Sequence, residues 1–275
     1  SPPLEKIAGP EKALELSRIG SDSMAELCQK YPDRFPAFIG SAPMNNPESL
    51  VAECRRVIEE LGAVGVQIFT NVSGKPLDLP EFEPFFEYMA STGKPVWLHP
   101  ARGENFPDYL TEKRSEYEIW WTFGWPYETS AAMARLVFSG IFDKYPGLKI
   151  ITHHAGGMVP FFEGRVGPGW DQMGKRTTDR DLSAVLKALK RPHLEYFKDF
   201  YADTASFGSR KAIEHAIEFF GEDHVLFASD APFDPEGGPM YIRETIRILD
   251  SLDVSEATRR KLYQDNAVRL LGLSI

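Results

Sequence analysis

The chain has 275 residues, of which 43% are hydrophobic and 12% aromatic, and this is enough to bury a full core within one domain spanning residues 1–275. Its 31 Lys and Arg residues against 40 Asp and Glu residues give a net charge of -9, which argues against a surface that neutralises nucleic-acid phosphates. Two cysteines, Cys28 and Cys54, are too few for a disulfide framework, and no apolar run reaches the roughly 18 residues of a membrane helix. We therefore expect a cytoplasmic protein with a small-molecule partner, no nucleic acid and no membrane.

Helix-like and strand-like patterns alternate along the chain without a linker between them. Apolar residues at helical spacing, with Pro or Gly at the boundaries, predict helices over residues 10–31, 47–61, 81–92, 126–145, 209–220 and 239–252. Short apolar runs predict strands over residues 35–41, 64–70, 95–99, 149–154, 201–206 and 225–230. The order of these elements predicts an α/β fold with six strands.

Most predicted strands are continuous apolar runs, such as residues 225–228, and this pattern is typical of parallel strands covered on both faces. An open doubly wound sheet and a closed (β/α)8 TIM barrel both fit such a series. Polar residues stand at the C-terminal ends of several strands, namely His99, His153, His154, Asp203 and Asp230. That distribution favours the barrel, whose active site is assembled from many strand ends, although the chain is two strands short of eight.

Three of the six histidines lie at predicted strand ends, in Leu98-His99-Pro100 and in Thr152-His153-His154. A neutral imidazole at such a position can bind a divalent ion or transfer a proton near neutral pH. A buried histidine that only donates to a backbone carbonyl is the structural alternative, but the convergence of three histidines with an acidic strand end favours a functional site. The other three, His193, His215 and His224, are expected to be structural.

Asp230 follows the apolar residues 225–228 almost directly, so its carboxylate is delivered to the mouth of the predicted barrel. A carboxylate buried there needs a compensating partner, and metal ligation is the option that also accounts for His99. The structural alternative is an aspartate that caps the next helix or forms an Asp-x-Pro turn with Pro232.

An ordered set of motifs along the whole chain resembles the amidohydrolase-related branch of the amidohydrolase superfamily, and within it the aminocarboxymuconate semialdehyde decarboxylase and γ-resorcylate decarboxylase group. The motifs are Leu98-His99-Pro100, Glu128-Thr129, residues 142–150, His154-Ala155-Gly156-Gly157 with Pro160 and Arg165, and residues 229–233. The resemblance implies that His99 is a metal ligand, that His154 is the catalytic histidine beside the metal, and that Asp230 both binds the metal and exchanges a proton. It implies a divalent cofactor, Zn or Mn. His153 is expected to point outward, because adjacent strand residues face opposite sides.

Two departures from the family pattern stand out. Family members begin with a strand that carries His-x-His or Glu-x-His, two further metal ligands, and the chain holds no such motif. We therefore expect this chain to be N-terminally incomplete, with the first two barrel strands missing and the metal absent if the ligands on them are missing. The second departure is at Ala155 and Gly157, where subgroups of the family carry Gly and Glu, and it argues against a close resorcylate analogue as the substrate.

Three functions remain open from the sequence. The resemblance favours a metal-dependent carboxy-lyase that decarboxylates an aromatic or unsaturated carboxylic acid, with Asp230 or His154 as the proton donor. The alternative is a hydrolase of an amide, lactone or ester, in which a metal-bound hydroxide attacks the carbonyl. The non-enzymatic alternative is a metal-free, inactive barrel that binds a ligand.

Two arginines, Arg102 and Arg165, are candidate clamps for a substrate carboxylate, since a guanidinium matches a carboxylate bidentately. The aromatic residues 120–125 are expected to wall a planar substrate, to pack against a partner copy, or simply to pack within a helix. By the family resemblance we also expect a homodimer or a higher homo-oligomer.

Overall fold

The structure, a computed structural model, describes residues 3–177, 179 and 181–274. Its α-helices are α1 (Leu4–Ile7), α2 (Pro10–Lys30), α3 (Pro47–Arg55), α4 (Glu83–Thr92), α5 (Ile119–Thr122), α6 (Gly124–Phe138), α7 (Ile141–Lys144), α8 (Ser183–Ala188), α9 (His193–Lys198), α10 (Arg210–Phe220), α11 (Pro239–Ser251), α12 (Glu256–Arg260) and α13 (Asn266–Leu271). Its strands are β1 (Gly40–Ser41), β2 (Val66–Phe69), β3 (Asn71–Val72), β4 (Lys75–Pro76), β5 (Val96–His99), β6 (Ile150–Thr152), β7 (Tyr201–Asp203) and β8 (Val225–Leu226). No helix among the described residues is both long and apolar enough to cross a membrane.

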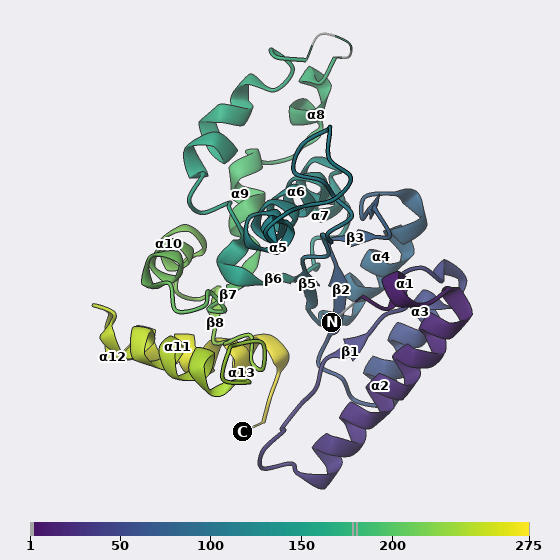
Figure 1. Ribbon diagram of the computed structural model, residues 1–275, viewed down its shortest axis with the longest axis vertical. Coiled ribbons are helices and arrows are strands. Elements are labelled where there is room, and N and C mark those ends of the chain that lie inside the picture. The colour runs from purple at the N-terminus through teal and green to yellow at the C-terminus, as the bar shows by residue number, and fades with distance from the viewer. Residues whose placement is uncertain (1–2, 178, 180, 275) are drawn as a thin grey trace.

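Six strands form one parallel sheet in the order β1-β2-β5-β6-β7-β8. The order follows the chain without a reversal, as in a barrel, whereas a doubly wound sheet reverses its order at a switch point. Figure 1 shows these strands at the centre of the molecule, with α2 and α3 on one side and α10 and α11 on the other. The predicted α/β class and the six parallel strands are confirmed, and the C-terminal ends of all six strands face the same side.

The strands are buried because both of their faces are covered by apolar side chains. Every residue of β5 and β6 is buried, including Leu98 and Ile150. Met133 and Leu136 of α6 and Ile213 of α10 belong to the same main core as these strands. Burial of such side chains is worth roughly 1.5–3 kcal/mol each, which holds the strand ends at fixed positions.

Three local differences separate the structure from the sequence prediction. The predicted helix over residues 126–145 is divided into α6 and α7 at Gly140, whose φ of 77° lies in the left-handed region that ends helices. The predicted strand over residues 225–230 keeps ladder pairing only over Val225–Leu226. The hairpin of β3 and β4 and the helices α8 and α9 were not predicted, because these segments are too short for a clear periodicity.

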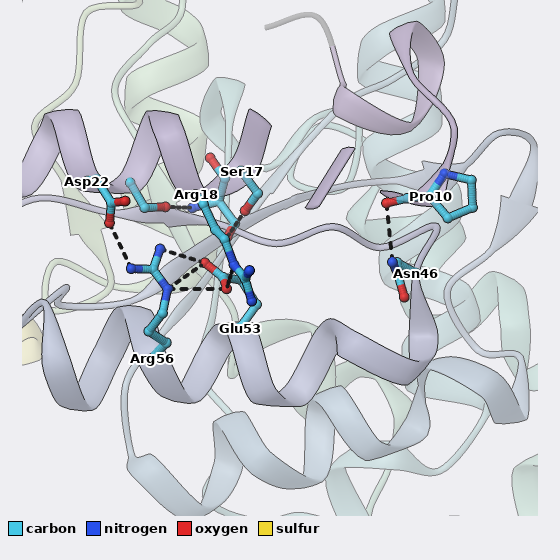
Figure 2. A network of polar contacts seen from close by, with 9 residues as sticks. Pro10, Ser17, Arg18, Asp22, Asn46, Glu53 and Arg56 are labelled. Atoms are coloured by element: carbon cyan, nitrogen blue, oxygen red, sulfur yellow. Dashed lines mark hydrogen bonds and ion pairs between the residues drawn. The ribbon is translucent and has the colours of Figure 1, made fainter. Parts of the chain in front are cut away.

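A buried ion-pair network fixes α2 against α3 (Figure 2). The carboxylate of Glu53, whose side chain is fully buried, accepts hydrogen bonds from Arg18 Nε at 2.9 Å and from Arg56 Nη2 at 2.8 Å. Arg56 also donates to Asp22 at 2.7 Å. Removing one partner of a buried pair typically costs roughly 3–5 kcal/mol, so this network is a structural clamp on the β1 side of the sheet.

Candidate active site

The three residues predicted to carry the chemistry lie together at the C-terminal ends of the strands. A ring nitrogen of His99, a ring nitrogen of His154 and a carboxylate oxygen of Asp230 all lie within 4.8 Å of one another. His99 is the last residue of β5, His154 follows β6, and Asp230 follows β8. These three positions are far apart in the sequence, and the parallel sheet brings them to one point.

His99 is held as a neutral imidazole. It is buried, its Nδ1 lies 2.7 Å from the carbonyl oxygen of Pro100, and its ring meets those of Phe69 and Trp125 edge to face at 5.5 and 5.2 Å. A carbonyl oxygen only accepts, so Nδ1 carries the proton and Nε2 keeps its lone pair. Burial, together with the nearby histidines, lowers the pKa of His99 to about 3. The Nε2 lone pair is therefore available to a metal at neutral pH.

His154 has the same tautomer, fixed by a different carbonyl. Its Nδ1 donates to the carbonyl oxygen of Ala205 at 2.9 Å, and its Nε2 is buried with no hydrogen-bond partner among the described residues. The ring of Trp125 stacks nearly parallel to it, with centroids 6.0 Å apart. A buried nitrogen without a partner is costly, so this Nε2 needs a metal, a substrate or a water.

The turn that presents His154 is built on Asp203, the last residue of β7. Its Oδ1 accepts hydrogen bonds from the backbone N–H groups of His154 at 2.9 Å and Ala205 at 3.0 Å, and its Oδ2 lies 2.9 Å from His153 Nδ1. Burial alone would raise the pKa of Asp203, but its contact with His153, the nearby His154 ring and the Ala205 N–H hold the pKa below its ordinary value. Asp203 is thus a buried anion that orients both histidines.

The prediction that His153 points outward is wrong. The extended strand ends at Thr152, and His154 and Ala155 adopt left-handed φ values of 58° and 56°. His153 itself is still extended, with φ -71° and ψ 159°, so the alternation breaks at His154 and both rings face the cluster; the ring of His153 lies 5.1 Å from that of His99. Its Nε2 is buried without a hydrogen-bond partner among the described residues, so His153 belongs to the same cluster.

Asp230 reaches the cluster although β8 ends four residues earlier. The Thr204 hydroxyl donates to the carbonyl oxygen of Ala228 at 2.8 Å and accepts a hydrogen bond from the Ala228 N–H at 2.9 Å. These two bonds extend the contact between β7 and the chain after β8. Burial raises the pKa of the Asp230 carboxyl, while the nearby His154 opposes that shift. Its φ of 65° is strained for a non-glycine residue, and such strain is concentrated at functional sites.

The donor set fits a divalent metal. His99 offers a free imidazole nitrogen and Asp230 a carboxylate oxygen, and the unpartnered Nε2 of His154 lies beside them. Two imidazoles with a carboxylate suit Zn²⁺ and Mn²⁺, and each histidine is oriented by a hydrogen bond from its other nitrogen, as metal-site histidines usually are.

An aromatic cavity opens beside the cluster, with a volume of about 310 Å³. His99 and Asp230 form one part of its wall. The remaining lining residues are Glu118, Trp120, Trp121, Trp125, Phe207, Phe233 and Tyr241. A flat, apolar wall of this kind suits a planar ligand, which is one of the roles expected for residues 120–125. The sequence contained no signal that would bring Phe207 and Tyr241 to the same wall.

The two predicted arginine clamps do not line this cavity in the described structure. The Arg102 guanidinium pairs with Glu128 at 3.3 Å and lies over the Phe106 ring, and its carbonyl accepts a hydrogen bond from Trp125 Nε1 at 2.9 Å. Arg165 is exposed and lies over the ring of Phe162. Arg102 therefore positions Trp125 with its backbone, and its charge is already paired.

Comparison with known proteins agrees with this geometry. Residues 8–273 match the family model described as "Amidohydrolase". The chain is 34% identical over 268 residues to 2-amino-3-carboxymuconate-6-semialdehyde decarboxylase of Dictyostelium discoideum, covering 97% of this chain and 69% of the relative. It is 30% identical over 284 residues to γ-resorcylate decarboxylase of Rhodococcus jostii, covering 99% and 81%.

A solved structure has the same fold. The 5-carboxyvanillate decarboxylase of Novosphingobium aromaticivorans, described with bound manganese and a nitrobenzoic acid, aligns with a TM-score of 0.83 and 30% identity. The alignment covers 99% of this chain and 75% of that one. The overlay extends over nearly all of the present chain, so the site described above lies within the shared part of the barrel.

Proposed function

This chain belongs to the amidohydrolase family, in its branch of metal-dependent decarboxylases, and on that premise we propose that it releases carbon dioxide non-oxidatively from an aromatic carboxylic acid. The observation that carries the proposal is the convergence of His99, His154 and Asp230 beside an aromatic cavity, whose wall includes His99 and Asp230. Relatives with this fold hold manganese, and the donor set of this chain suits the same ion.

The metal would be held by His99 and Asp230, and when bound it supplies positive charge that orients the oxygens of the substrate. The planar ring of the substrate lies between the indole rings of residues 120–125 and Phe207, which exclude water. His154 presents its Nε2 on the same side, held by the Asp203 turn.

A proton is then delivered to the ring carbon that bears the carboxylate. Two donors are placed for this step: Asp230, whose pKa is raised by burial, and His154 in its imidazolium form, because the neutral ring keeps its proton on Nδ1 and a lone pair on Nε2. The bond between the ring and the carboxylate carbon breaks, its electron pair returns to the ring, and carbon dioxide leaves. The net reaction consumes one proton and needs no oxidant or reductant.

We further propose that copies of the chain associate through the loop that follows β5. In this loop Leu110 is 104% exposed and Tyr117 is 91% exposed. Phe123, just beyond the loop, is 70% exposed. Large apolar side chains that are exposed in one segment are candidates for an interface between proteins. The two free cysteines, Cys28 and Cys54, support the prediction of a reducing, cytoplasmic setting.

A substrate screen tests the main proposal. Manganese-loaded protein would be incubated with hydroxybenzoates and muconate-type acids while carbon dioxide release is followed, beside a panel of lactones and amides. Release from the aromatic acids is expected. Turnover confined to the second panel would instead identify a hydrolase, and the absence of any turnover with stoichiometric metal bound would contradict both enzymatic functions.

A further inference from the structure

We propose that Glu118 selects the substrate by charge: the cavity takes an aromatic acid with one carboxylate and a hydrogen-bond donor such as a phenolic hydroxyl, and it rejects a second carboxylate. This inference rests on the proposed decarboxylase function and names the substrate class of that site. The supporting observations are the charged and polar side chains that line the cavity.

The cavity wall carries acidic side chains and no basic Lys or Arg side chain among its described residues. The acidic side chains are those of Asp230 and Glu118. The guanidinium of Arg102, whose carbonyl oxygen accepts a hydrogen bond from Trp125, is engaged by Glu128. One substrate carboxylate can be matched by the divalent ion. A second carboxylate would meet Glu118 with no cation of this chain beside it.

Glu118 lies on a different part of the wall from the metal ligands. The ring of Trp125 is 5.2 Å from that of His99, the ring of Trp121 is 6.4 Å from that of Trp125, and the Trp121 indole N–H donates to Glu118 Oε2 at 2.9 Å. The two indoles thus separate Glu118 from His99. A ring that places its reacting carboxylate at His99 can therefore direct another substituent toward Glu118.

The carboxylate of Glu118 is held in place and has one free oxygen. Tyr117 and Glu118 adopt left-handed φ values of 52° and 58° just before α5, and the Glu118 carbonyl accepts hydrogen bonds from the N–H groups of Trp121 and Thr122. Oε2 is occupied by the Trp121 indole, while Oε1 has no donor within the described part of the chain. Oε1 can accept a hydrogen bond from a substrate hydroxyl, and it repels an anionic substituent.

The experiment compares a matched pair of ligands in the manganese-loaded protein: 2-hydroxy-3-methoxybenzoate, with one carboxylate, and 5-carboxyvanillate, which has the same hydroxyl and methoxy groups and a second carboxylate. Both kcat/KM for carbon dioxide release and Kd from quenching of tryptophan fluorescence are measured. Glu118→Gln removes the charge and keeps an oxygen that can accept from Trp121. Glu116→Gln is the control, because Glu116 is a nearby exposed glutamate that does not line the cavity.

The wild-type protein is expected to favour the monocarboxylate at least 10-fold. Glu118→Gln should reduce that preference about 10-fold, mainly through a lower KM and Kd for the dicarboxylate, and Glu116→Gln should leave it unchanged. The preference should also shrink at high ionic strength, because Glu118 is exposed and its charge is screened.

Equal use of both acids by the wild-type protein, or an unchanged preference in Glu118→Gln, would overturn the inference while carbon dioxide release still supported the decarboxylase. If no acid released carbon dioxide but Kd still showed a charge preference that Glu118→Gln abolished, the proposed reaction would fail and the role of Glu118 would stand.

Discussion

Asp203 Oδ1 accepts a hydrogen bond from the backbone N–H of His154 at 2.9 Å, although the two residues lie 49 positions apart on neighbouring strands. The same carboxylate faces His153 through its other oxygen. His154, one of the two proposed proton donors, is therefore presented by an anion on the neighbouring strand β7, which holds a left-handed turn in place. This relationship leads to the first prediction.

Asp203→Asn should lower kcat at least 10-fold, because the amide removes the charge that orients His153 and His154. It should also reduce the free energy of unfolding by roughly 3 kcal/mol, since a buried charge partner is lost. Steady-state kinetics and urea unfolding measure the two effects. Asp199→Asn is the matched control, because Asp199 is a half-exposed aspartate near β7 that pairs with Arg191. Equal effects of both substitutions would contradict an orienting role for Asp203.

His99→Ala should remove stoichiometric metal. Loss of even an outer partner of a metal ligand costs roughly 10–100-fold in metal affinity, so loss of the imidazole itself should cost at least about 100-fold. Metal per subunit is measured by elemental analysis after dialysis against dilute chelator. His215→Ala serves as the control, since His215 packs against Phe161 away from the cluster. A His99→Ala protein that retained full metal content would rule out His99 as a ligand.

Asp230→Asn should lower the activity and raise the stability of the metal-free protein. We expect kcat to fall by roughly 100-fold or more, because the proton donor is lost. Burial raises the pKa of Asp230, so its ionised form destabilises the native state at neutral pH when no metal is bound. The metal-free variant should therefore unfold at a higher urea concentration than the metal-free wild type at pH 7.5, and the gap should narrow as the pH falls. Reduced stability in the metal-free variant would refute this account of Asp230.

The stability of the metal-free protein should fall below pH 6.5 in a way that depends on His99. The pKa of His99 is about 3 in the folded protein and has its ordinary value of 6.5 in the unfolded chain. Between these pH values the unfolded state binds a proton that the native state does not. The unfolding free energy is then lost as the pH falls, by up to about 1.4 kcal/mol per unit. Urea unfolding at pH 7.5 and 4.5 should show a loss about 2.7 kcal/mol larger for the wild type than for His99→Gln, since about two pH units lie between 6.5 and 4.5. Identical losses would show that His99 is not buried in its neutral form.

The exposed loop beyond β5 should govern self-association. Replacing Leu110 by Asp together with Tyr117 by Ser places charge and polarity where the largest exposed apolar side chains lie. Light scattering coupled to size exclusion should show a lower mass for this double variant than for the wild type. Ile19→Ser on α2, which is 54% exposed, should leave the mass unchanged. A monomeric wild-type protein would refute the proposed interface.

The sequence alone determined the α/β class, the six parallel strands and which residues meet at the strand ends as candidate metal ligands. Those features depend on local patterns: apolar runs of strand length, and His99, His154 and Asp230 at or just beyond strand ends. Parallel strands place all their C-terminal ends on one side, so residues at these ends meet whatever the details of packing.

Only the tertiary structure decided how the side chains around the cluster are used. The left-handed turn at His154, held by Asp203, brings His154 to the same side as His153, whereas strand alternation predicts opposite sides for these two residues. The guanidinium of Arg102 pairs with Glu128, which lies 26 positions further along the chain, and does not line the cavity. Glu118 reaches the cavity wall because the long loop after β5 folds back over the strand ends. These outcomes depend on contacts between residues distant in sequence, and local periodicity carries no information about such contacts.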